Sequence, residues 1–384
     1  MTEKDIVILW DLPDNIYLKM KNSYRNYFFK VLKNNFTSLY NLAKLLKMKC
    51  SYLYNYKSGR YCISLKKLKE IVSLLPDNLK IKLLNEIEKN LEFIKFGIRN
   101  SKPIRNPKLP LVFSENSIKL SRIIGHVIGD GGIINKPYDY HVHYTNKSKK
   151  LVEHFKNDMI EVVGNVHYSS GIGKSKTRWI QFPSIVGIIL IKMFGFQTKD
   201  LKHVPKVILY TNKETKFAFL RTLFDDEGGV SISKYTIAFT MTNKKVMETV
   251  KEMLKQYGIN VGKISKIIPE ENQKIKYRFV ISGHEDLNSF NNVIGFEHPE
   301  KHKKLKLVLA NYIRLQYKKG QFKNVVIDLL KEKGSLTITE IAKNTNRVLS
   351  GSFRDRIRKL EKEKSIVSQT KTGKIKVYSL PEKI

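Results

Sequence analysis

The hydrophobic pattern along this chain changes from a helical period to a strand period. In the first hundred residues, apolar positions recur every third or fourth residue in Tyr27–Leu32, Leu39–Leu46, Ser51–Tyr56 and Leu65–Leu75. This spacing places the apolar side chains on one face of a helix. In the middle of the chain, Tyr140, Val142 and Tyr144 alternate with His141 and His143, as in a half-buried strand. The pattern predicts a helical start and a mixed middle section.

The middle section contains an internal repeat with an offset of 97 residues. Asp130-Gly-Gly is followed after 15 residues by Thr145-Asn-Lys, and Glu227-Gly-Gly is followed after 15 residues by Thr242-Asn-Lys. The apolar positions of the alternating segment return at the same offset, as Ile237, Phe239 and Met241. Each copy reads helix, two strands, helix, two strands and helix. The repeat predicts a pseudo-twofold, duplicated αββαββα core of the α+β class.

Composition divides the chain into four parts. Pro103, Pro107 and Pro110 cannot continue a helix and favour an extended linker with few contacts over residues 97–117. The other parts are predicted to be a helical domain over 1–96, the duplicated core over 118–318 and a third domain over 319–384. Within the core, the repeats are predicted to cover about 118–210 and 215–315.

Every part of the chain is basic. Its 384 residues include 71 Lys and Arg against 35 Asp and Glu, a formal net charge of +36. The excess is +13 over residues 1–110 (22 against 9), +14 over 111–318 (33 against 19) and +9 over 319–384 (16 against 7). A polyanionic partner explains this excess, and nucleic acid is the commonest polyanion. A lysine-rich surface without a partner is the alternative.

Several classes of protein do not fit the sequence. No run of about 18 apolar residues is present to span a membrane. The first residues lack the basic and apolar segments of a secretory signal. Cys50 and Cys62 are too few for a disulfide framework or a zinc ribbon. We expect a cytoplasmic protein without a membrane partner.

Each repeat ends its first predicted helix at an acid followed by two glycines, with Asp130 in the first copy and Glu227 in the second. Glycine commonly caps a helix, but an acid is unfavourable at the negative end of the helix dipole. The same unfavourable choice at two equivalent places indicates a bound cation. The alternative is one solvated acid in each of two turns.

The first helix of the first repeat carries glycines four residues apart, Gly125 and Gly129, which would let a second helix approach closely. If the first helices of the two repeats cross there, Asp130 and Glu227 lie side by side. Neighbouring carboxylates repel each other unless they share a divalent metal. Because metal-activated water can hydrolyse a phosphodiester, the predicted chemistry is that of a nuclease.

These segments are similar to those of a known family. Ile123–Gly131 (IIGHVIGDG) and Leu220–Gly228 (LRTLFDDEG) resemble the two signature helices of the LAGLIDADG homing endonucleases, especially the single-chain, two-motif archaeal members. The resemblance covers roughly residues 118–315. It implies paired sheets that form a saddle over the major groove of double-stranded DNA, and cleavage of both strands across the minor groove. It also implies Mg²⁺ or Mn²⁺ as the cofactor.

The resemblance assigns roles to four residues of this chain. The eighth residue of each signature helix is the metal-binding catalytic acid, which corresponds to Asp130 and Glu227. A lysine in the strand-to-helix turn assists catalysis in the family, and the matching positions are Lys147 and Lys244.

Three residues depart from the signature. Thr222 stands where the second copy should have glycine, His126 replaces an apolar residue, and Asp226 precedes the acid where a small residue is common. We expect Thr222 to loosen the helix crossing. None of the three removes a catalytic acid, so we expect the activity to be retained.

The strands carry candidate DNA contacts. His141 and His143 share one strand face, and contact with DNA is preferred there over a zinc site. Gln181 and Arg278 belong to the later strands of the two repeats, and Thr240 is the counterpart of His143. These five residues are predicted to bind DNA.

The N-terminal part resembles a helix-turn-helix of the phage-repressor type, with helices over Leu39–Leu46 and Ser51–Gly59. Ser51 is predicted to cap the recognition helix, and Tyr52, Asn55 and Tyr56 to contact DNA. The alternative is a plain helical domain.

The C-terminal part resembles a winged helix. Arg354 and Arg358 lie in its predicted recognition helix, and Lys371 and Lys374 lie in its predicted wing. A plain helical domain is again the alternative.

Together these features predict a site-specific endonuclease that cuts double-stranded DNA and has an accessory DNA-binding domain at each end. We expect a free-standing protein rather than a whole intein, and a monomer because the core is already duplicated. The rival hypothesis is a catalytically weak or inactive protein on the same scaffold that binds DNA or RNA, such as a transcription regulator or an intron maturase.

Overall fold

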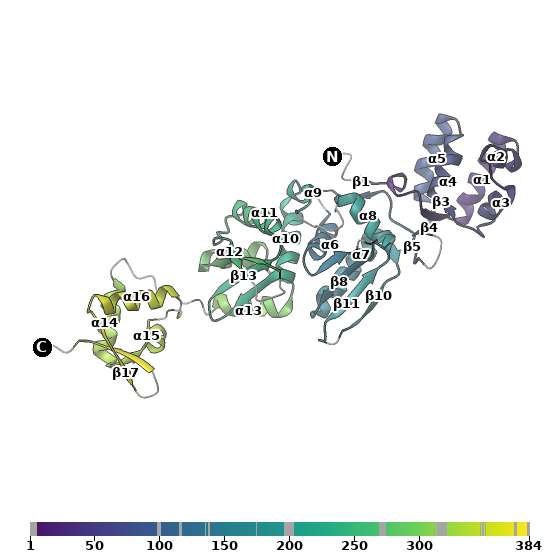
Figure 1. The fold of residues 1–384 in the computed structure, drawn as a ribbon. Coiled ribbons are helices and arrows are strands. Elements are labelled where there is room, and N and C mark those ends of the chain that lie inside the picture. The colour runs from purple at the N-terminus through teal and green to yellow at the C-terminus, as the bar shows by residue number, and fades with distance from the viewer. Residues whose placement is uncertain are drawn as a thin grey trace.

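The computed structural model shows three groups of elements along the chain (Figure 1). It describes residues 6–97, 101–114, 117–134, 136, 139–173, 175–195, 203–268, 274–310, 312, 321–345, 347, 349, 351–371 and 375–381. One hydrophobic cluster extends from Val7 to Val308, and a second lies between Phe322 and Tyr378. The last group therefore has a core of its own.

The N-terminal group combines helices with strands, where the sequence predicted a mostly helical domain. Its elements are β1 (Ile6–Val7), a 3₁₀ turn (Leu9–Asp11), β2 (Ile16–Met20), α1 (Asn22–Phe36), α2 (Leu39–Leu45), α3 (Cys50–Ser58), β3 (Ile63–Ser64), α4 (Leu65–Ser73), α5 (Asp77–Lys89) and β4 (Leu91–Phe96). Ile16, Leu18 and Met20 are buried at every second position and the residues between them are half-buried, which is a strand pattern. β2 pairs with β4 across a separation of more than seventy residues, so local periodicity did not indicate the pair.

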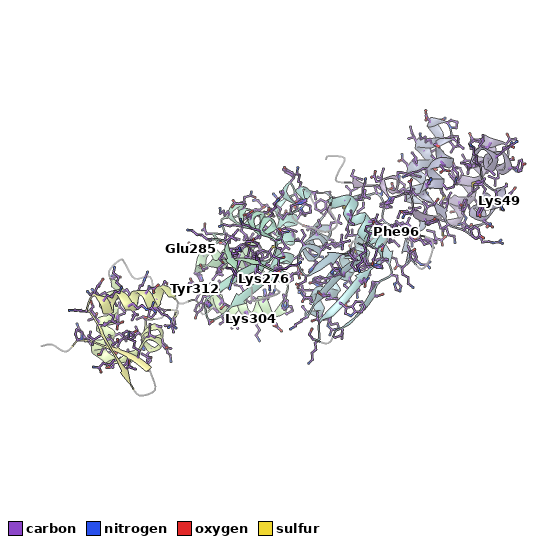
Figure 2. All side chains as sticks on the ribbon, viewed as in Figure 1. Lys49, Phe96, Lys276, Glu285, Lys304 and Tyr312 are labelled. Atoms are coloured by element: carbon purple, nitrogen blue, oxygen red, sulfur yellow. The ribbon has the colours of Figure 1, made fainter. Side chains whose placement is uncertain are left out.

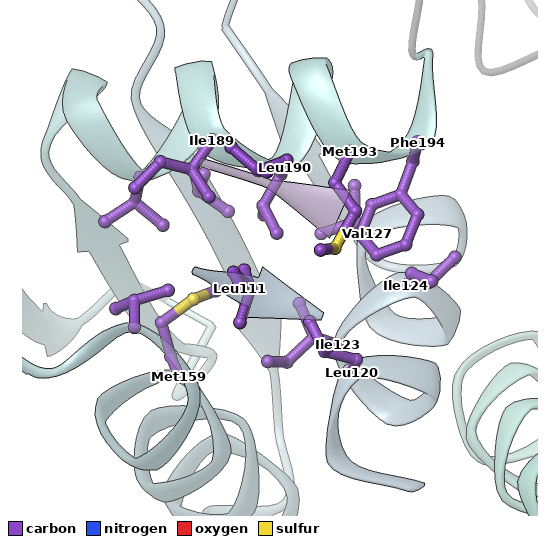
Figure 3. Packing of buried hydrophobic residues seen from close by; sticks show 14 of the residues in the cluster. Leu111, Leu120, Ile123, Ile124, Val127, Met159, Ile189, Leu190, Met193 and Phe194 are labelled. Atoms are coloured by element: carbon purple, nitrogen blue, oxygen red, sulfur yellow. The ribbon is translucent and has the colours of Figure 1, made fainter. Parts of the chain in front are cut away.

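The predicted linker is part of the fold, and the expectation that it makes few contacts is wrong. It contains β5 (Ile104–Arg105) and β6 (Leu111–Val112). β5 pairs with β4 on one side and with β9 (Asn165–Val166) on the other, so one sheet of order β3-β2-β4-β5-β9 joins the N-terminal group to the first repeat. β6 pairs with β1. Figure 3 shows Leu111 of β6 among side chains of α6, α7 and α8.

The middle group is duplicated as the repeat predicts. The first copy has α6 (Ile118–Ile128), β7 (Gly131–Ile133), β8 (Val142–Asn146), α7 (Lys149–Val163), β10 (Ser169–Ile172), β11 (Arg178–Phe182) and α8 (Ser184–Phe194). After the short α9 (Lys206–Leu209), the second copy has α10 (Lys213–Glu227), β12 (Gly228–Ser231), β13 (Thr236–Met241), α11 (Lys244–Gln256), β14 (Ser265–Ile267), β15 (Lys276–Ser282) and α12 (His284–Val293), and α13 (Pro299–Ala310) follows. The sheet orders β10-β11-β8-β7 and β14-β15-β13-β12 correspond strand by strand.

The register also repeats. His143 pairs with Gln181 in the first sheet, and Thr240 pairs with Arg278 in the second, each residue 97 positions after its counterpart. The buried faces correspond as well. Buried Val142 is opposite buried Phe182 in the first sheet, and their counterparts Phe239 and Phe279 are buried opposite each other in the second. Equivalent positions of the two sheets therefore face the same way.

The C-terminal group has helices packed with a small antiparallel sheet. Its elements are α14 (Gln321–Lys333), β16 (Leu336–Thr337), α15 (Ile338–Asn344), α16 (Gly351–Lys362), β17 (Val367–Lys371) and β18 (Ile375–Ser379), with the sheet order β16-β18-β17. This order contains the predicted helices and strand pair, and its assignment as a winged helix stays a prediction. Among the described residues, no helix has the length and apolar character needed to cross a membrane.

Candidate active site

The two signature helices cross where the sequence predicts. A Cβ atom added to Gly125 of α6 would lie 2.8 Å from Cβ of Thr222 on α10 and 3.1 Å from the carbonyl oxygen of Phe219. Real side chains do not tolerate such distances, so the backbones approach closely only because Gly125 has no side chain. Thr222 fits this crossing with its hydroxyl donated to the carbonyl of Ala218, at 2.9 Å.

The acids of the two repeats come together beside this crossing. Glu227 is the last residue of α10, and Asp130 lies two residues beyond α6, because Gly129 already leaves the helical conformation. Burial raises the pKa of Asp130 to about 7, and the charge of Asp226 adds to the shift. Burial, followed by the charges of Asp130 and Asp226, raises the pKa of Glu227 to about 7. The carboxylates are close enough to repel one another, as paired metal ligands are when no cation lies between them.

A third carboxylate, Asp226, is buried beside the pair. It accepts hydrogen bonds from the hydroxyl of Tyr144 at 2.7 Å and the amide of Asn146 at 3.5 Å, and pairs with Nδ1 of His126 at 3.0 Å. A Cβ atom on Gly129 would lie 2.6 Å from its Oδ2, so Asp226 fills the space that this glycine leaves. Two departures from the signature, His126 and Asp226, therefore contact each other across the interface between the repeats.

The C-terminal end of α10 is held by α13 and the turn before it. Lys301 donates from Nζ to the carbonyl oxygens of Phe224, Asp225 and Asp226 in the last turn of α10, where the backbone N–H of Gly228 also donates to Phe224. The buried carboxylate of Asp225 accepts from the backbone N–H groups of Glu297 and His298, at 3.0 and 2.9 Å. Burial lowers the pKa of Lys301. The charge of Lys301 offsets part of the rise in the pKa values of Asp130 and Glu227. These contacts fix the backbone that carries Glu227.

The predicted DNA contacts of the strands occupy corresponding places. The pairs His143–Gln181 and Thr240–Arg278 are half-buried on the less buried faces of their sheets. His141 is half-buried and its Nδ1 pairs with Asp139. In the described part of the chain, Nδ1 of His143 and Nε of Arg278 are buried without a hydrogen-bond partner, so each has a polar atom to offer a ligand.

The comparison with family models decides the relationship. Residues 214–295, from α10 to the turn after α12, match the model described as the LAGLIDADG-like domain. The chain carries a LAGLIDADG-like domain. The predicted resemblance to the LAGLIDADG family is confirmed, and so is the α+β fold class. The match covers the second repeat, and the first repeat has the same order of elements and the same strand register.

Curated relatives match this chain over part of their length. The replication factor C small subunit of Methanocaldococcus jannaschii is 29% identical over 199 residues, which are 51% of this chain and 10% of that protein. The glutamine–fructose-6-phosphate aminotransferase of the same organism is 24% identical over 310 residues, which are 79% of this chain and 26% of that protein. The chain thus spans a minor part of both relatives.

Solved structures that align with part of this chain were also found. The homing endonuclease I-DmoI in complex with DNA and Mn is 20% identical with a TM-score of 0.35, and the alignment covers 47% of this chain and 97% of that one. Full-length DUF199/WhiA from Thermatoga maritima is 16% identical with a TM-score of 0.38, and the alignment covers 65% of this chain and 93% of that one.

The two lysines implied by the resemblance lie between a strand and the next helix or at that helix's first residue, with Lys147 in the turn between β8 and α7. Lys147 is exposed, directly after Asn146, whose amide donates to Asp130 at 2.9 Å. Lys244 is the first residue of α11 and pairs with Glu248 at 3.4 Å. Their catalytic role stays a prediction.

The three residues of the N-terminal part that were predicted to contact DNA differ in how exposed they are. Tyr52 is exposed on α3, whereas Asn55 is half-buried and its carbonyl accepts from the backbone N–H of Tyr61 at 3.2 Å. Tyr56 is half-buried against the hydrophobic cluster, which leaves less of it available to DNA than predicted. Ser51 is not the helix cap, since α3 begins at Cys50 with Lys49 before it.

The C-terminal candidates are only partly described. Arg354 and Arg358 are exposed one turn apart on α16, and Arg358 pairs with Asp355 at 3.3 Å. Lys371 is the last residue of β17, and Lys374 lies outside the described residues. The helix-turn-helix and winged-helix assignments stay predictions.

Sequence reasoning missed three residues that contact the acids or hold the helix carrying them. Asp226 was recognised as a departure only, although its position next to Glu227 was a signal. Asn146 belongs to the repeated Thr-Asn-Lys motif, which marked it as a candidate. Lys301 had no local signal, because its role depends on α13 packing at the end of α10.

Proposed function

We propose that this chain is a site-specific endonuclease that hydrolyses phosphodiesters in both strands of double-stranded DNA, with Asp130 and Glu227 as the residues that hold a divalent cation. The observation that carries the proposal is the meeting of the two acids at the crossing of α6 and α10. Burial raises the pKa of both to about 7, the charge of Asp226 adds to the shift of Asp130, and the charges of Asp130 and Asp226 add to that of Glu227. A divalent cation between them would remove that repulsion.

The donor atoms suit Mg²⁺ or Mn²⁺. Both residues offer carboxylate oxygen, and no group of three or more His, Cys, Asp or Glu side chains in the described residues is placed to hold a metal by itself. Mg²⁺ commonly binds one or two carboxylates and completes its shell with water and substrate phosphates. When bound, such a cation supplies activated water and neutralises charge on the phosphate.

Residues around the acids keep them in position. The amide of Asn146 donates to Oδ2 of Asp130 at 2.9 Å, which orients that carboxylate. Lys301 holds the last turn of α10 and so fixes the backbone beside Glu227. Lys147 and Lys244 are proposed to assist the reaction, as the resemblance implies. The charge of +36 supplies long-range attraction to DNA.

The names of the two curated relatives denote a replication factor subunit and an aminotransferase, which are unrelated activities. The matched part makes up 10% and 26% of the length of those proteins. The activities in the names are therefore not proposed for this chain.

A DNA- or RNA-binding protein without cutting activity is the second candidate. Exposed arginines on α16 and exposed Tyr52 on α3 favour it, because flanking binding domains alone would provide a regulator's affinity. The same experiment separates the two candidates.

The test selects bound duplexes from a DNA library and maps cut ends in the presence of Mg²⁺ or Mn²⁺. Asp130→Asn and Glu227→Gln should each reduce cutting at least roughly 10³-fold, as the loss of a catalytic group does, while binding stays within about threefold. Glu252→Gln, an exposed acid on α11 whose ion-pair partner is Lys255, is the matched control and should cut normally.

Cutting that persists in either acid variant would show that the assignment of the acids is wrong. Selective binding without cutting by the unaltered protein, in both metals, would favour the binding protein.

A further inference from the structure

The sheet that joins the N-terminal group to the first repeat has one buried face and one open face. Opposed residues of an antiparallel pair lie on the same face. Ile16, Leu18, Ile94 and Ile104 are buried on one side of β2, β4 and β5. The other side carries Tyr17 and Lys19 of β2, Phe93 and Lys95 of β4, and Arg105 of β5. We call these five residues the joint face.

Rings and cations alternate on the joint face. Tyr17 is opposite Lys95, and Phe93 lies between Lys19 and Arg105 on the two neighbouring strands. Arg105 is exposed, and the other four are half-buried. Glu92 pairs with Lys19 at 3.5 Å, and both side chains of this pair stay partly exposed. Such a pair contributes little and leaves Lys19 available to an anion.

The joint face continues onto α3 and the turn after it. Tyr56 and Tyr61 line a small pocket together with Lys19, which places both tyrosines beside the face. The rings of Tyr52 and Tyr61 lie 6.4 Å apart, and nearly half of the surface of each tyrosine is exposed. Aromatic side chains therefore extend from the open strands to the predicted recognition helix.

The chain around the joint face contains no acid over a long stretch. Residues 15–69 include 13 Lys and Arg and neither Asp nor Glu. Over the whole chain the ratio is 71 to 35, so chance would place several acids there. Their absence favours an anionic partner, and the rings favour one with flat apolar groups to stack against.

We propose that the joint face binds a single strand of DNA, with Tyr17 and Phe93 stacking on unpaired bases and Lys19, Lys95 and Arg105 contacting its phosphates. Bases within a duplex are already stacked on one another, so rings on an open sheet gain contacts only with an unpaired strand. The choice of DNA over RNA rests on the proposed function, because β5 continues through β9 into the repeat that would hold DNA.

The test measures fluorescence anisotropy of a labelled oligothymidine strand of about 12 nucleotides, a length that covers one binding surface of this kind. Tyr17→Leu with Phe93→Leu should weaken binding at least ~10-fold, since stacking on two rings is lost while their apolar bulk remains. The double variant Tyr17→Phe with Phe93→Tyr keeps a ring at both positions and should bind the strand as tightly as the unaltered protein. Tyr210→Leu, at a tyrosine 81% exposed outside this sheet, is the matched control.

Lysine replacement gives a second, independent readout. Lys95→Gln should make the slope of log affinity against log salt shallower by about 0.7, the value for one phosphate contact on a single strand. Asp130→Asn should bind the strand as tightly as the unaltered protein. That result separates the joint face from the proposed acid pair, so the failure of one proposal is distinguishable from the failure of the other.

Three outcomes would overturn the proposal. One is equal affinity of the double leucine variant and the unaltered protein for the single strand. Another is an equal loss for the single strand and for a duplex of the same length. The third is tighter binding of an oligouridine strand than of oligothymidine, which would assign the joint face to RNA.

Discussion

At the scale of single residues, two departures from the family signature compensate each other. Asp226 has a fully buried side chain, and His126 is almost as buried. A buried carboxylate is costly unless donors surround it, and here His126, Tyr144 and Asn146 do so. The second repeat has Leu223 at the position equivalent to His126, and the first has Gly129 at the position equivalent to Asp226. The polar pair therefore occurs once and makes the two halves of the interface unequal.

This pairing predicts strong coupling between the two residues. His126→Leu should destabilise the protein by about 1–3 kcal/mol, because Asp226 loses a buried partner. The double variant with Asp226→Ala should lose less than the sum of the single variants, with a coupling free energy of about 0.5–3 kcal/mol. Urea unfolding of the four proteins measures this. Additive losses would show that the contact contributes nothing.

At the scale of elements, the crossing of α6 and α10 depends on one missing side chain. The contact at Gly125 involves Cβ and Cγ2 of Thr222, at 2.8 and 2.9 Å from the added Cβ, and a backbone oxygen at 3.1 Å. Side-chain atoms can be removed by substitution, but the backbone oxygen cannot. The sequence suggested that Thr222 would loosen the crossing. In the structure Thr222 instead contributes the atoms that pack nearest to Gly125.

Substitutions at the crossing should therefore be asymmetric. Gly125→Ala should cost about 1–3 kcal/mol by overpacking, and Gly125→Leu should prevent folding. Adding Thr222→Gly to Gly125→Ala should recover part of the loss, but not all, because glycine within a helix costs about 1 kcal/mol. Thermal melts followed by circular dichroism measure the order of stabilities. Equal stability of Gly125→Ala and the unaltered protein would mean that the helices do not cross at this point.

At the scale of the whole molecule, the N-terminal part and the duplicated core share one hydrophobic cluster, while the C-terminal part has another. β1 pairs with β6, and β4 pairs with β5, so two pairings tie residues before the linker to residues within it. Exposed Lys49 lies in the N-terminal group, and exposed Lys276 and Lys304 lie in the middle group, which agrees with a basic excess spread along the chain (Figure 2).

The two ends should respond differently to deletion. Removing residues 319–384 should leave the remainder folded and reduce the salt dependence of DNA binding, because a charge of +9 (16 against 7) is lost. Removing residues 1–100 should destabilise the core, since β5 and β6 lose their partners β4 and β1. Limited proteolysis and melting curves of both truncated proteins measure this. A core that is equally stable after either deletion would contradict the shared sheet.

The sequence by itself determined the features that depend on local period and on repetition. The 97-residue offset predicted the duplicated α+β core, its strand register and the meeting of Asp130 with Glu227, because a repeated pattern of buried positions allows one register. Gly125 predicted the helix crossing for a local reason as well, since a missing side chain permits close approach.

Only the tertiary structure decided which distant residues meet. Two-residue strands such as β5 and β6 have no readable period, and their partners are set by packing across the chain, so the supposed spacer became part of a sheet. The contacts of Asp226 with Tyr144 and of Lys301 with the end of α10 follow from the same cause. They join residues about 80 positions apart, and each side chain alone is compatible with an ordinary surface position. Burial, which the sequence does not encode residue by residue, gave these polar groups their partners.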